Sequence, residues 1–175
     1  IVAQRLDPLK VYTVCSFSDD LALIGVARTP GDRQVDTKDG PARVSRYDGY
    51  SVMFAYPNTD AFVNLRVDLS RPGEFANDRR AIAAAMERAS QPPATSVTPV
   101  GIQGVNGYAL KAPANRGVID WYSLFDEPRS ITLTAYFLGQ RPGRQRFRTD
   151  AEYATLRDRF LQTYLACIPH EAGGR

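Results

Sequence analysis

Residues 50–69 decide the fold of this protein, and they read YSVMFAYPNTDAFVNLRVDL. In both halves of this stretch, large apolar side chains recur at every second position. The alternating residues are Tyr50, Val52, Phe54 and Tyr56 in the first half and Val63, Leu65, Val67 and Leu69 in the second. A period of two indicates a strand with one buried face. Because the short link over residues 57–60 joins the two runs, they are predicted to form an antiparallel hairpin.

Helical periodicity follows this hairpin and returns at the end of the chain. Over residues 78–89, one face carries Ala81, Ile82, Ala85, Met86 and Ala89. Their spacing of three and four residues is typical of an amphipathic helix. A second helix is predicted over residues 149–167, where Thr149 and Glu152 have the spacing of a capping box. Its apolar stripe consists of Tyr153, Leu156, Phe160, Tyr164 and Cys167.

Strand-like segments make up most of the remaining chain. Four lie between the helices, over residues 96–102, 108–112, 118–125 and 131–138, and two lie near the start, over residues 11–17 and 21–28. Residues 29–48 are rich in turn-forming pairs and are predicted as hairpin turns and loop. The short connections favour antiparallel pairing. We therefore predict the α+β class, with a largely antiparallel sheet packed against two long amphipathic helices, similar to an α/β/α sandwich.

Length and composition indicate one domain over residues 1–175. With 43% hydrophobic residues, the chain can build a single core. Residues 169–175 have no apolar anchor and are predicted to be a disordered tail. The longest apolar run is far shorter than the ~20 residues that a membrane-spanning helix needs, so no transmembrane segment is predicted.

The two cysteines, Cys15 and Cys167, lie at opposite ends of the chain. Cys15 falls in the first predicted strand and Cys167 on the apolar stripe of the last helix, so both sulfurs are predicted to point inward. They either form a disulfide or stay as two buried free cysteines. A disulfide would indicate an oxidising compartment. Residues 1–4 are similar to the end of a signal peptide cleaved after Ala3. Together these features predict an exported bacterial protein, periplasmic or secreted.

The sequence lacks the residues that most catalytic mechanisms and cofactor sites require. The only histidine, His170, falls in the predicted tail, which argues against a serine or cysteine triad. One histidine and two cysteines are too few for a structural zinc site, and no glycine-rich phosphate loop leads into a helix. We therefore predict no metal and no cofactor. A pair of carboxylates for hydrolysis stays open, because any two carboxylates can meet in space.

Two groups of residues are candidate binding surfaces. Four arginines lie in the loop before the last helix, namely Arg141, Arg144, Arg146 and Arg148. They form either a solvated basic loop or a docking loop for an acidic partner protein or an anionic lipid surface. Nucleic acid is not predicted as a partner, because most aromatic residues fit core positions. Trp121 and Tyr122 lie on opposite faces of one predicted strand, and each either lines a ligand cleft or belongs to the core.

From Gly49 onward, the order of elements resembles the PsbP/Mog-type superfamily of α/β/α sandwiches. The resemblance rests on residues 49–57, a Gly-Tyr-Ser strand that ends in Tyr-Pro. A second strand, an amphipathic helix, further strands around the turn at residues 104–107 and a long final helix follow it. The resemblance covers residues 49–168 and leaves residues 1–48 unassigned. Most members of that superfamily are non-catalytic, and they act as extrinsic subunits, small binding proteins or envelope lipoproteins. The resemblance therefore implies a non-catalytic protein.

Three functions are compatible with these features. The missing catalytic groups favour an exported, non-catalytic protein-interaction or accessory module of the bacterial envelope. A carrier of a small ligand or lipid, with an apolar cleft lined by Trp121 or Tyr122, is the first alternative. A hydrolase with an unrecognised carboxylate pair is the second.

Overall fold

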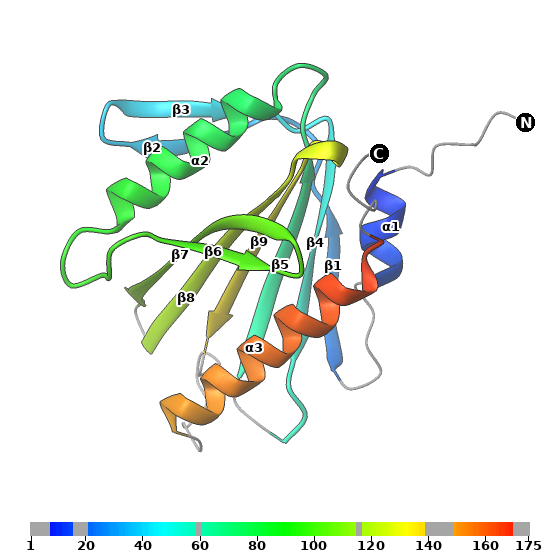
Figure 1. The fold of residues 1–175 in the computed structure, drawn as a ribbon, viewed down its shortest axis with the longest axis vertical. Coiled ribbons are helices and arrows are strands. Elements are labelled where there is room, and N and C mark those ends of the chain that lie inside the picture. Colours follow the sequence, from blue (N-terminus) through cyan, green and yellow to red (C-terminus); the bar gives the residue numbers. More distant parts are fainter. Residues whose placement is uncertain (1–7, 16–20, 59–60, 115–116, 139–148, 170–175) are drawn as a thin grey trace, which may run out of the picture.

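The computed structural model describes residues 8–15, 21–58, 61–114, 117–138 and 149–169. Its helices are α1 (Pro8–Cys15), α2 (Phe75–Ala89) and α3 (Asp150–Cys167), with a short 3-10 turn at Glu127–Arg129. Its strands are β1 (Ala22–Arg28), β2 (Arg33–Thr37), β3 (Gly40–Val44), β4 (Asp48–Ala55), β5 (Phe62–Leu69), β6 (Thr98–Ile102), β7 (Val105–Ala114), β8 (Gly117–Asp126) and β9 (Ile131–Leu138). Seven strands form one sheet in the order β1-β4-β5-β9-β8-β7-β6, and β2 and β3 form a separate hairpin (Figure 1).

The sheet is antiparallel throughout, and its central strands β5 and β9 are largely buried on both faces. On one face, the sheet packs against α1 and α3 around residues such as Leu65, Leu133 and Phe160. On the other face, α2 and the β2–β3 hairpin cover a second, smaller cluster that includes Phe125 and Ile82. The α+β class and the antiparallel sheet are therefore confirmed. The expectation of two long helices was incomplete, because a third, short helix is present at the start of the chain.

That third helix, α1, contains residues 11–15 of the segment 11–17 that was predicted as a strand, so the prediction was wrong for these five residues, and residues 16–17 lie outside the described part of the chain. Pro8 occupies the first helical position, where the missing N–H costs nothing. Leu9 and Tyr12, three residues apart, are the buried residues of the helix and join the main core. The β-branched residues that indicated a strand face outward or are half-buried. Tertiary packing has overridden a weak local preference.

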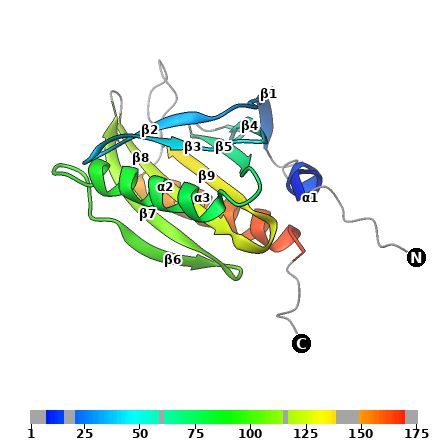
Figure 2. The ribbon, with the colours of Figure 1, turned by 90° about the horizontal axis from the view of Figure 1, so that it is seen from above.

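Cys15 and Cys167 are at disulfide distance, with 2.17 Å between their sulfurs. Both views place α1 beside the end of α3, as this pairing requires (Figures 1 and 2). The sulfurs do not both point inward as predicted, since Cys15 is half-buried and Cys167 is exposed. The buried stripe of α3 runs instead through Leu161 and Leu165 near its end, which places Cys167 beside the stripe.

The predicted elements of the remaining chain form with small shifts. The hairpin of β4 and β5 pairs over residues 48–69, and Thr149 caps α3 with the predicted capping box. Residues 29–48, predicted as hairpin turns and loop, contain the β2–β3 hairpin. Helix α2 begins at Phe75, three residues earlier than expected, and Glu74 is its N-terminal flanking residue. Among the helices of the described residues, none is long and apolar enough to cross a membrane.

Candidate binding pocket

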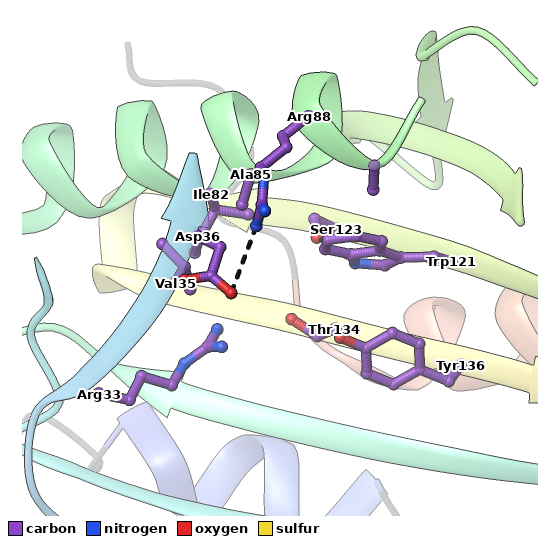
Figure 3. Close-up of a pocket in the computed structure, with 11 residues that line it drawn as sticks. Arg33, Val35, Asp36, Ile82, Ala85, Arg88, Trp121, Ser123, Thr134 and Tyr136 are labelled. Atoms are coloured by element: carbon purple, nitrogen blue, oxygen red, sulfur yellow. Dashed lines mark hydrogen bonds and ion pairs between the residues drawn. The ribbon is translucent and has the colours of Figure 1, made fainter. Parts of the chain in front are cut away.

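A hollow of about 440 Å³ lies between the β2–β3 hairpin, helix α2 and the sheet (Figure 3). We call it the hairpin pocket. It is lined by Arg33, Val35, Asp36, Ile82, Ala85, Arg88, Ala89, Trp121, Ser123, Thr134 and Tyr136. Its volume falls within the range of small-molecule sites in proteins.

The two faces of the sheet differ in polarity, and the pocket lies over the more polar face. On β9, Leu133, Ala135 and Phe137 face the main core, whereas Thr132, Thr134 and Tyr136 face the side of α2. Across the hollow, α2 presents Ala85 and Ala89, whose small side chains leave the space unfilled.

Two aromatic rings form one wall of the pocket. Trp121 on β8 and Tyr136 on β9 are paired across the sheet, with ring centroids 5.7 Å apart and planes inclined by 39°. The Trp121 indole donates its N–H to Ser123 Oγ at 3.0 Å, which fixes the orientation of the ring. Burial raises the pKa of Tyr136, so its phenol stays neutral. This wall offers a flat surface on which a planar molecule could stack.

Charged side chains form the opposite side. Arg33 is largely buried, and one of its Nη atoms lies 3.9 Å from Asp68 Oδ2, while Arg46 Nη1 lies 3.6 Å from Asp68 Oδ1. One buried carboxylate is therefore shared by two guanidinium groups. Burial lowers the pKa of Arg33, an effect that Asp68 partly offsets. At the rim, Arg88 and Asp36 pair at 3.3 Å (Figure 3).

Several polar atoms around the pocket are buried and have no hydrogen-bond partner in the described part of the chain. They include Thr134 Oγ1, in a residue that is only 2% exposed, and Nε of Arg33. Figure 3 shows the Arg33 guanidinium and the Thr134 side chain facing the same space, beside the rings of Trp121 and Tyr136. Buried polar groups in folded proteins almost always have partners. The arrangement can therefore supply hydrogen bonds to a molecule that enters the pocket.

The structure separates the two aromatic residues singled out in the sequence. Trp121 lines the hairpin pocket, whereas Tyr122 faces α3 and lines a smaller hollow of about 270 Å³. Trp121 and Tyr122 therefore do not line one common cleft, and the lining of the pocket around Trp121 is polar as well as aromatic. The candidate docking loop of Arg141, Arg144, Arg146 and Arg148 lies outside the described residues, as do His170 and the proposed signal-peptide remnant at residues 1–4.

Sequence reasoning missed Arg33, Thr134 and Tyr136. One signal for Thr134 and Tyr136 was available in the sequence. Thr132, Thr134 and Tyr136 alternate with the apolar residues of the same strand, which indicates a polar face on one side of the sheet. No such signal existed for Arg33, because nothing local shows that the β2–β3 hairpin folds over the sheet. Asp36 is the single carboxylate in the pocket lining, and no group of three metal-ligating side chains forms among the described residues.

The fold is that of an α+β protein with a pocket on one face of an antiparallel sheet. Two aromatic rings form one wall of this pocket, and polar or charged side chains line the rest together with apolar ones. No protein-family model matches this chain, and no curated protein matches it either.

Proposed function

We propose that this protein is a non-catalytic binding module that holds a small planar molecule in the hairpin pocket. One observation carries the proposal. A buried hydroxyl without a partner, on Thr134, and a buried guanidinium, on Arg33, face one hollow beside the rings of Trp121 and Tyr136. A few convergent polar groups beside an aromatic wall are typical of small-ligand sites.

Binding accounts for this site better than catalysis does. Among the described residues, the lining contains neither a histidine nor a cysteine, and its one carboxylate, Asp36, pairs with Arg88. An acid–base pair of carboxylates therefore does not form in this pocket. The resemblance to the PsbP/Mog-type superfamily, whose members are mostly non-catalytic, favours the same conclusion.

We further propose that the protein works in an oxidising compartment, as an exported bacterial protein. The cysteine pair at disulfide distance supports this location, because disulfides persist outside the reducing cytosol.

Filling the pocket should abolish binding, and Ala85 is the position from which to fill it. Ala85 is buried in the lining, so Ala85→Leu places three additional carbons in the hollow. Trp121 is the only tryptophan, so its fluorescence reports on the pocket directly. We expect benzoate or benzamide, at millimolar concentration, to change this fluorescence saturably in the natural protein. In Ala85→Leu the affinity should fall by at least about tenfold, because the hollow is occupied.

The matched control is Ala76→Leu, an exposed position on the same helix, which should bind as the natural protein does. Equal affinity in Ala85→Leu and Ala76→Leu would place the binding elsewhere. If neither compound perturbs Trp121, the proposed function is wrong.

A second function, docking of a partner protein, is favoured by the outer strand of the sheet. β1 is an edge strand, and among the described strands it pairs with β4 alone. Leu23, Ile24 and Val26 on this strand are 48%, 49% and 56% exposed. An edge strand with exposed apolar side chains is suited to an extended apolar segment of another polypeptide, which would add one strand to the sheet. The arginine loop over residues 141–148 lies outside the described residues and stays a separate prediction for docking of an acidic partner.

Lysine in an edge strand blocks such pairing, so Val26→Lys should abolish partner binding. Val118→Lys, at a similarly exposed valine on β8, is the control. Affinity capture from a bacterial envelope extract should recover a stoichiometric protein with the natural chain and with Val118→Lys, but not with Val26→Lys. The same recovered proteins with all three chains would reject the edge-strand site.

A further inference from the structure

The hairpin pocket carries an excess of positive charge. Beside and beneath it lie four guanidinium groups, those of Arg33, Arg46, Arg66 and Arg88. Two carboxylates, Asp36 and Asp68, oppose them, which leaves two positive charges in excess. Arg66 lies directly opposite Thr134 in the register of β5 and β9. Among the described residues, no carboxylate lies within ion-pair distance of Arg66.

The geometry of Asp68 shows how incompletely this charge is neutralised. Asp68 is 3% exposed, and its two contacts to Arg33 and Arg46 are long, at 3.9 and 3.6 Å. Neither of its oxygens has a hydrogen-bond partner among the described residues. A buried cation usually has a close, hydrogen-bonded counter-charge, because leaving water without one is costly. Arg33 lacks such a partner on the side that faces the pocket.

Apart from the two oxygens of Asp68, the unpartnered polar atoms around the pocket can all donate hydrogen bonds. Nε of Arg33 and Nε of Arg66 are buried and have no partner in the described part of the chain, and a guanidinium group can only donate. The hydroxyl of Thr134 is buried, has no partner and can donate as well. A molecule that satisfies these groups must bring acceptors. The combination of excess cations with unsatisfied donors calls for an oxyanion.

The aromatic wall adds the second half of the specificity. Trp121 and Tyr136 stand side by side next to the space that Arg33 and Thr134 face (Figure 3). A ring that stacks on these two side chains would place a substituent at its edge close to the guanidinium and the hydroxyl. Inorganic anions would satisfy Arg33 but would leave the wall uncovered.

We infer that the hairpin pocket binds an aromatic or similarly planar carboxylate, whose carboxylate group contacts Arg33 and Thr134 and whose ring stacks against Trp121 and Tyr136. This inference rests on the proposed function and names the class of ligand. It assigns the anion to Arg33 rather than to Arg88, because Asp36 already pairs with Arg88.

Benzoate and benzamide test this inference without any substitution, because they have nearly the same shape and differ in charge. We expect the natural protein to bind benzoate more tightly than benzamide by about 10- to 100-fold, as measured by the fluorescence of Trp121. Sodium sulfate at equal ionic strength should not compete with benzoate beyond the effect of sodium chloride.

Arg33→Gln should reduce the preference for benzoate to about equal affinity for the two compounds, and Thr134→Val should reduce it in part. The matched control is Arg43→Gln, on the same hairpin, whose exposed side chain contacts Asp32 and Glu74 away from the pocket. Arg33→Lys, which keeps the charge, should retain part of the preference for benzoate. Such a retained preference would show that the site still folds when Arg33 is replaced.

The outcomes separate the two proposals. If benzamide binds the natural protein as tightly as benzoate and Ala85→Leu weakens both, the pocket binds small molecules but the anionic class is wrong. If benzoate is preferred and Arg33→Gln leaves this preference unchanged, the assignment to Arg33 is wrong. If sulfate displaces benzoate strongly, the site binds anions regardless of an aromatic ring, and the proposed stacking against Trp121 and Tyr136 is wrong. If neither aromatic compound binds, the proposed function fails first.

Discussion

Replacing Cys15 and Cys167 together by serine is expected to lower the free energy of unfolding by about 3–5 kcal/mol. The two residues are 152 positions apart, so the cross-link restricts nearly the whole unfolded chain. The chain-entropy model gives about 5 kcal/mol for a loop of this length, and measured losses are commonly smaller. Urea denaturation of the oxidised natural protein and of the double variant measures the difference.

Reduction supplies the control for this prediction. A thiol reductant should destabilise the natural protein by a similar amount and leave the double variant unchanged. The lost stability should appear first at α1, because the helix has eight residues and few buried side chains, Leu9 and Tyr12. A loss below about 1 kcal/mol would show that the two cysteines contribute little to the folded state.

Asp78→Ala is expected to cost about 3–4 kcal/mol of stability. Asp78 lies in α2, is 1% exposed and forms no ion pair with any of the described residues. Its carboxylate accepts hydrogen bonds from the backbone N–H of Ser45 at 2.8 Å and from the hydroxyl of Ser70 at 2.6 Å, as well as from the Ser45 hydroxyl. Hydrogen bonds to a charged group contribute about 1.5–3 kcal/mol each, and their loss leaves buried donors unsatisfied.

Glu87→Ala is the matched control, because Glu87 is exposed on the same helix. It should change stability by less than about 0.5 kcal/mol. Urea denaturation of both variants gives the comparison. If Asp78→Ala falls within about 1 kcal/mol of Glu87→Ala, the carboxylate does not anchor α2 to the loop around Ser45.

The strands and the long helices could be predicted because their signals are local. The alternation over residues 50–69 and the capping box at Thr149 each specify structure within a few residues, and both are present in the fold. Helix α1 could not be predicted in the same way. Its residues favour a strand locally, and their helical state depends on the burial of Tyr12 against a core that is built from the rest of the chain.

The candidate site was predictable only in its aromatic part. Trp121 stands out as the single tryptophan, and the strand alternation places it opposite Tyr122. Arg33 and Thr134 are 101 positions apart in the sequence, and they meet only because the β2–β3 hairpin folds across the sheet under α2. The polarity of this sheet face can be predicted from the sequence, but the pocket above it depends on tertiary structure. For the same reason, the sharing of Asp68 by Arg33 and Arg46 has no local signature.

The indole N–H resonance of Trp121 in a ¹H–¹⁵N correlation spectrum tests the central claim most directly. One tryptophan gives one such signal, and the N–H belongs to a residue that lines the hairpin pocket. Adding benzoate should shift this signal saturably, together with the backbone amides of Thr134 and Ala85, and should leave the amides of Leu161 and Gln162, on α3 beside the smaller hollow, unchanged. A signal that stays in place while benzoate is raised to millimolar concentration, or shifts confined to the side of α3, would contradict the assignment of the pocket.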